Sequence, residues 1–78
     1  MFNVAILGAS GYTGVELVRL ISMHPEFKIH SLSGETKSGL KFGEVYPSLQ
    51  YLNLPNLCYV SDINYNDLDL VFCALPHT

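Results

Sequence analysis

The chain has 78 residues, of which 49% are hydrophobic, and its formal net charge at pH 7 is −3. This length allows one small globular domain, and the scattered cationic side chains exclude the broad basic surface that nucleic acids or anionic membranes require. No stretch approaches the roughly 18 apolar residues of a membrane span, and the N-terminus does not resemble a secretory signal. We therefore expect a cytoplasmic protein without a nucleic-acid or membrane partner.

The first elements of the chain are indicated by local patterns. Residues 2–7 form a short apolar run bounded by a glycine, which predicts a buried strand. Residues 12–23 carry dense aliphatic side chains with only two charges, which predicts a helix packed closely against a sheet. This helix should end at His24, because the residue before Pro25 is disfavoured in helical conformation.

The alternation of side chains over residues 27–33 predicts a second strand, with Phe27 and Ile29 on one face and Leu32 on the other. Residues 34–56 are rich in glycine and proline and are expected to form a long loop with one short element.

Three further elements are predicted in the last third of the chain. Residues 57–60 are expected to form a third strand, residues 61–68 one helical turn, and residues 68–75 a buried strand that ends at Pro76. A strand, a glycine turn, a helix and further strands are the opening of a doubly wound α/β fold. We predict a partial Rossmann-like parallel sheet in which a right-handed crossover makes the first two strands neighbours.

The stretch "AILGASGYTG", residues 5–14, joins the first predicted strand to the helix and places glycines at Gly8, Gly11 and Gly14. Gly8 would allow a sharp turn off the strand, Gly11 would let a pyrophosphate approach the backbone, and Gly14 would let the helix pack closely. The spacing is one residue longer than the dinucleotide fingerprint G-x-G-x-x-G, and a purely structural turn is the alternative.

The residues around these glycines favour the dinucleotide interpretation. A helix N-terminus carries unpaired N–H groups and a partial positive charge, which suit a phosphate. Ser10 and Thr13 add hydroxyl donors at the same place. His77 follows the last predicted strand at the carboxyl edge of the sheet, where ligands bind in open α/β folds.

The end of the second predicted strand indicates which dinucleotide is bound. NAD-binding units usually place an acidic residue there, about 20 residues past the turn. This chain has Ser33 and Gly34 at that point, followed by Glu35, Lys37 and Lys41. A hydroxyl and lysines accept a 2′-phosphate that a carboxylate would repel, so we predict NADP rather than NAD. Glu35 counts against this choice, and a solvated loop is the alternative for both lysines.

Cys58 and Cys73 are the two cysteines of the chain, and neither has a Cys or His at metal-ligand spacing. We expect two buried thiols in a reducing compartment and no metal site.

Residues 8–25, "GASGYTGVELVRLISMHP", closely resemble the N-terminal signature of the N-acetyl-γ-glutamyl-phosphate reductase family. Related aspartate-semialdehyde dehydrogenases carry a different glycine motif, and the residues that favour the reductases are Tyr12-Thr13-Gly14, Glu16-Leu17 and His24-Pro25. "SGLKFGEVYPSL" (38–49) and "DLVFCALPH" (69–77) are similar to later segments of the same family, so the resemblance covers the whole chain.

This resemblance implies an NADPH-dependent reduction of N-acetyl-glutamyl phosphate to the semialdehyde, in arginine biosynthesis, through a cysteine thioester with an assisting histidine. The family's cysteine lies in a Gly-Cys-Tyr-Pro-like motif that this chain does not contain, and neither Cys58 nor Cys73 matches it. We therefore expect no catalytic residue here and no activity of the chain alone.

Carried over residue by residue, the resemblance implies that residues 1–78 are the N-terminal part of an NAD(P)-binding Rossmann domain of an enzyme that is a homo-oligomer at full length. The expected cofactor-binding residues are Gly8, Ser10, Gly11, Tyr12, Thr13, Gly14, Ser33, Lys37, Pro76 and His77. The alternatives are a stand-alone nucleotide-binding or regulatory module without catalysis, or the cofactor domain of an aspartate-semialdehyde dehydrogenase.

Overall fold

The computed structural model describes residues 1–34 and 37–75. These residues form a four-stranded parallel sheet in the order β3-β2-β1-β4. The strands are β1 (Phe2–Leu7), β2 (Phe27–Ser33), β3 (Leu57–Cys58) and β4 (Leu70–Cys73). The helices are α1 (Tyr12–Ser22) and α2 (Phe42–Val45), and the short 3₁₀ turns are η2 (Pro47–Leu49), η3 (Val60–Asp62) and η4 (Tyr65–Asp67).

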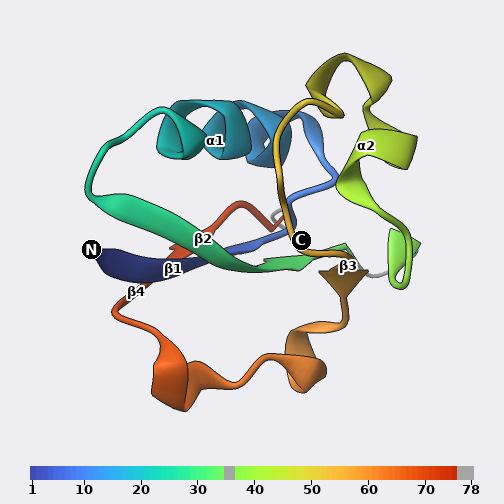
Figure 1. The fold of residues 1–78 in the computed structure, drawn as a ribbon. Helices are drawn as coiled ribbons and strands as arrows, with labels where there is room; N and C mark the ends of the chain where they lie inside the picture. Colours follow the sequence, from blue (N-terminus) through green and yellow to red (C-terminus); the bar gives the residue numbers. More distant parts are fainter. Residues whose placement is uncertain (35–36, 76–78) are drawn as a thin grey trace.

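The two faces of the sheet are covered by different parts of the chain. Figure 1 shows α1 and α2 on one side of the sheet and the connection from β3 to β4, with its two 3₁₀ turns, on the other. β1 and β2 are adjacent and parallel, as predicted, and β1 also pairs with β4. The arrangement is the predicted α/β sheet of Rossmann-like type.

β1 is one of the two inner strands of the sheet, and its middle is fully buried. Val4, Ala5 and Ile6 are all 0% exposed, because neighbouring strands flank β1 and chain covers both of its faces. A strand buried on both faces has no reason to alternate apolar and polar residues, which explains its continuous apolar run. The core cluster under α1 and α2 consists of Val4, Ile6, Ala9, Val18, Ile21, Leu32, Phe42, Leu49 and Leu57.

A register shift in β2 corrects the predicted alternation of its side chains. Val4 pairs with Ile29 and Ile6 pairs with Leu32, so one extra residue lies in β2 between the two pairs. Paired residues of a sheet point to the same face, and therefore Ile29 and Leu32 share the core face instead of facing opposite sides. The prediction was wrong because it assumed a strand without a bulge.

β4 is shorter and more exposed than the buried strand predicted over residues 68–75. Leu70 is 41% exposed and Val71 is 45% exposed, while Phe72 packs against the core. In the described part of the chain β4 is an edge strand that pairs only with β1, so its side chains lose the cover that a central strand receives. Cys73 is consequently exposed, which contradicts the expected buried thiol, whereas Cys58 is half-buried and its Sγ donates to the Leu32 carbonyl.

The segment predicted as a long loop, residues 34–56, contains α2 and η2. Phe42 is 2% exposed and Leu49 is 8% exposed, so this segment is anchored in the core through one side chain from each element. The third strand shrinks to Leu57–Cys58, and two 3₁₀ turns replace the single helical turn expected after it. Among the described residues, no helix has both the length and the apolar character to cross a bilayer.

Replacing Phe42, the buried side chain of α2, should lower the stability of the whole domain. We expect Phe42→Ala to lower the free energy of unfolding by about 3–5 kcal/mol, because it removes a buried aromatic ring and leaves a cavity. Tyr51→Ala is the matched control, since Tyr51 is 74% exposed, and its effect should stay within about 0.5 kcal/mol. Urea unfolding followed by circular dichroism measures both changes, and equal effects would contradict the assigned core.

Candidate dinucleotide-binding site

The glycine turn, defined here as residues 8–11, leads from the carboxyl end of β1 into α1. Gly8 has a φ of +77°, in the left-handed region that favours glycine. A Cβ at Gly8 would lie 2.9 Å from the Ala74 carbonyl oxygen, just beyond β4. Gly8 is therefore required by both its backbone conformation and the close approach of a neighbouring segment.

Gly14 is also required by packing within the chain. A Cβ at this position would overlap the Gly8 carbonyl oxygen and lie 2.7 Å from the Cα of Ala9. The first turn of α1 therefore rests directly on the glycine turn, which agrees with the predicted close contact between helix and strand.

Gly11 has no comparable reason to be glycine. Its φ of −84° and ψ of 173° are extended values that any residue adopts. The nearest described atom to a Cβ here would be the Gly8 carbonyl oxygen at 3.7 Å, an ordinary van der Waals contact. The strained-turn explanation therefore does not apply to Gly11, and the open space beside its backbone is available to a ligand.

The N-terminus of α1 presents free hydrogen-bond donors beside Gly11. No side chain caps this helix, and among the described residues no partner receives the backbone N–H groups of the exposed Tyr12 and Thr13. Tyr12 is 91% exposed and Thr13 is also exposed. Open N–H groups at the positive end of a helix dipole form a site that suits an anion.

The charges on α1 leave this end of the helix electropositive. The first turn contains no acidic residue, and the single acid of α1, Glu16, forms a 2.9 Å ion pair with Arg19. The hydrogen bond from Arg19 and its positive charge lower the pKa of the Glu16 carboxyl, although both side chains are exposed. Glu16 is thus paired with the residue one turn further along instead of with the open N–H groups.

Ser33 lies at the end of β2, as predicted, and its side chain faces inward to the glycine turn. It is 0% exposed, and its Oγ accepts the Gly8 N–H at 2.9 Å. Its carbonyl oxygen accepts the Ala9 N–H at 2.8 Å, so the end of β2 holds the first half of the glycine turn. A direct contact of this hydroxyl with a ribose stays a prediction, since the described structure uses it to hold Gly8.

Of the other residues considered at the end of β2, Gly34 and Lys37 lie near the glycine turn, whereas Lys41 lies at α2. Gly34 packs against Ser10, because a Cβ at Gly34 would lie 3.0 Å from the Ser10 Oγ. Lys37 is exposed, and its N–H donates to the Gly34 carbonyl at 2.7 Å, which keeps it near the glycine turn. Glu35 and the predicted site residues Pro76 and His77 lie outside the described residues.

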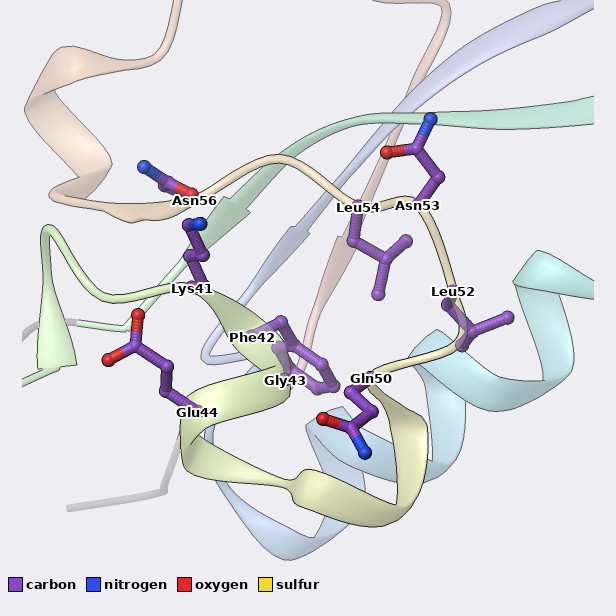
Figure 2. A pocket seen from close by; sticks show the side chains of 9 residues that line it. All are labelled: Lys41, Phe42, Gly43, Glu44, Gln50, Leu52, Asn53, Leu54 and Asn56. Carbon is purple, nitrogen blue, oxygen red and sulfur yellow. The ribbon is translucent and has the colours of Figure 1, made fainter.

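Lys41 lines a cavity of about 350 Å³ between α2 and residues 50–56. Figure 2 shows the buried ring of Phe42 at the centre of this cavity, with Lys41 and Glu44 on one side and Asn53 on the other. None of residues 8–14 lines it. Lys41 therefore lines a cavity that the glycine turn does not share, at the N-cap of α2.

Tyr46 was missed as a member of this region by the sequence analysis. Its hydroxyl donates a hydrogen bond to the carbonyl oxygen of Ser10, 36 residues away in the chain. The tyrosines have no regular spacing, so no local pattern could have indicated this contact.

The described residues contain no constellation for metal binding. No group of three or more His, Cys, Asp or Glu side chains among them is placed to hold a metal ion.

Comparisons with known proteins identify relatives over nearly the whole chain. A family model described as "Semialdehyde dehydrogenase, NAD binding domain" matches residues 3–78. The chain is 58% identical over 75 residues to an N-acetyl-gamma-glutamyl-phosphate reductase of Ruegeria pomeroyi, covering 96% of this chain and 22% of that protein. It is 50% identical, over 96% of this chain and 18% of the relative, to a probable chloroplastic N-acetyl-gamma-glutamyl-phosphate reductase of Oryza sativa subsp. japonica.

A solved structure shares the fold. The crystal structure of aspartate semialdehyde dehydrogenase with NADP from Candida albicans superimposes with a TM-score of 0.78 at 28% identity, covering 97% of this chain and 24% of that one. The chain thus spans about a fifth of the length of the curated relatives it matches, 22% for the Ruegeria protein.

The different roles of Gly14 and Gly11 predict different effects of the same substitution. Gly14→Ala should cost about 1–3 kcal/mol or more of stability, because the new methyl group overlaps backbone atoms. Gly11→Ala should cost at most about 1 kcal/mol, the usual difference between glycine and alanine at a helix N-cap. Thermal unfolding measures both, and a larger loss for Gly11→Ala would contradict the assignment.

Proposed function

The chain belongs to the family of semialdehyde dehydrogenase NAD-binding domains, and from this premise we propose that it binds NADP(H) through the glycine turn and the N-terminus of α1. The observation that carries the proposal is Gly11. Among Gly8, Gly11 and Gly14 it is the one for which the described residues show neither a positive φ nor a steric clash, and it lies beside the N–H groups of Tyr12 and Thr13. Its N-cap position alone would accept Ser, Asn or Asp at least as well as Gly. A ligand that must approach the backbone closely supplies a reason for glycine.

The residues present fit the pyrophosphate of a dinucleotide. Gly11 would leave room for a phosphate against the backbone, and the N–H groups of Tyr12 and Thr13 would donate to its oxygens. Gly8 and Gly14 would act indirectly by giving the turn its shape. The hydroxyls of Ser10 and Thr13 are the further donors that we assign to this end of the cofactor.

A preference for NADP over NAD is proposed from the chemistry at the end of β2. The exposed Lys37 follows the end of β2 and would add an ionic contact to a 2′-phosphate, and Ser33 stands where NAD-binding units usually carry a carboxylate. The Candida albicans relative with the same fold was solved with NADP, which supports this choice. Pro76 and His77 complete the proposed cofactor-binding set.

We further propose that the longer protein containing this domain is a reductase that converts N-acetyl-glutamyl phosphate to the semialdehyde. The reductase relatives are 50–58% identical to the chain, whereas the aspartate semialdehyde dehydrogenase is 28% identical. Sequence identity therefore favours N-acetyl-glutamyl phosphate as the substrate. NADPH supplies the hydride in such a reaction. This domain would hold NADPH and contribute no catalytic side chain. Location in the cytoplasm and assembly as a homo-oligomer belong to the same proposal.

Gly11→Val should abolish NADPH binding and leave the fold intact. The valine side chain would occupy the space assigned to the phosphate, while the φ of −84° accommodates a β-branched residue without strain. Isothermal titration with NADPH measures binding, and circular dichroism of the same sample measures the fold. A folded variant that retains wild-type affinity would refute the phosphate assignment.

The wild-type domain should bind NADPH at least about tenfold more tightly than NADH, the gain expected from one charge-assisted contact with the 2′-phosphate. Lys37→Ala should reduce this ratio without changing the affinity for NADH. Titrations with both nucleotides test the prediction, which fails if NADH binds equally well or better. Lys41→Ala is the control, since Lys41 lines the cavity between α2 and residues 50–56, which none of residues 8–14 lines.

A further inference from the structure

The hydrogen bond between Tyr46 and the glycine turn connects two parts of the site that are distant in sequence. The Tyr46 hydroxyl donates to the carbonyl oxygen of Ser10, and the half-buried ring packs on Phe42 with centroids 5.3 Å apart. Tyr46 stands between α2 and η2, the segment that is anchored in the core by Phe42 and Leu49.

Two backbone hydrogen bonds hold Tyr46 in place against the core. The Tyr46 N–H donates to the Phe42 carbonyl at 2.9 Å, and its own carbonyl accepts the Leu49 N–H at 2.9 Å. Because both partners are core residues, the ring has little freedom to move away from the turn.

The acceptor of this bond belongs to the peptide group between Ser10 and Gly11. The carbonyl of Ser10 and the N–H of Gly11 lie in one plane and point in opposite directions, since the bond is trans. The Gly11 N–H donates to the Gly8 carbonyl at 3.2 Å. Tyr46 and Gly8 therefore hold the two ends of a single peptide plane, directly before the open N–H groups of α1.

Holding this plane matters because the turn has little intrinsic stiffness. Gly8 and Gly11 flank the Ala9–Ser10 pair, and glycine resists backbone rotation less than any other residue. A turn that is already ordered before binding loses less conformational entropy when a ligand arrives. A bond that fixes its last peptide should therefore raise the affinity for a ligand at this end of α1.

We propose that Tyr46 is a positioning residue for nucleotide binding: its hydroxyl fixes the Ser10–Gly11 peptide and thereby orders the glycine turn for the pyrophosphate. This inference rests on the proposed NADP(H) function. Tyr46 acts through Ser10 and need not touch the cofactor. The α2–η2 segment thus contributes to binding although it lies outside the strand–turn–helix unit.

The test is Tyr46→Phe in the full-length protein, which removes the hydroxyl and keeps the ring packed on Phe42. We expect the Kd for NADPH to rise about three- to tenfold, the effect of one lost hydrogen bond. Tyr65→Phe is the matched control, because it removes a tyrosine hydroxyl that donates to the Val60 carbonyl at 3.1 Å in the β3–β4 connection. Its Kd should not change.

Amide hydrogen exchange at Gly11 provides a second readout that does not depend on the nucleotide. It should become faster in Tyr46→Phe and stay unchanged in Tyr65→Phe, while the thermal midpoints of the two variants remain similar. An unchanged Kd or an unchanged Gly11 exchange rate in Tyr46→Phe overturns the inference, as does an equal weakening of binding in both variants. If the wild-type protein fails to bind NADPH, the proposed function fails, and the exchange rate still shows whether Tyr46 holds the peptide.

Discussion

The backbone of Gly8 is the constraint on which the rest of the site depends. Its positive φ turns the chain off β1, its N–H is bound by Ser33 at the end of β2, and its Cα lies against Ala74 after β4. Three strands therefore meet at one residue without a side chain. Because the carboxyl ends of parallel strands share one edge of a sheet, this junction lies where α/β folds bind their ligands.

Gly8, Gly11 and Gly14 have different physical roles. Gly8 and Gly14 are needed so that chain segments can approach each other, whereas Gly11 faces open space. A motif of three glycines is often interpreted as a single feature, but two of these would be conformational requirements in a protein without any ligand. The functional information is concentrated in the third, where internal packing gives no reason for glycine.

The segment between β2 and β3 is a folded part of the site. Its glycines and prolines indicate a loop, yet Phe42 and Leu49 bury in the core and fix the position of Tyr46 against the glycine turn. Coverage of the sheet is uneven, since α1 and this segment pack on one side while Leu70 and Val71 of the edge strand β4 stay exposed. The packing that supports the site is thus concentrated under α1 and α2.

The sequence by itself determined β1, the end of α1 before Pro25, the span of β2 and the glycine turn, because apolar periodicity, proline and glycine act within a few residues. Tertiary structure alone decided that Leu32 shares a face with Ile29 and that the Ser33 hydroxyl turns inward to Gly8. It also decided that Tyr46 reaches Ser10. These features depend on strand register and on how distant segments pack together, and the two hydrogen bonds join residues 25 and 36 positions apart that no local pattern connects.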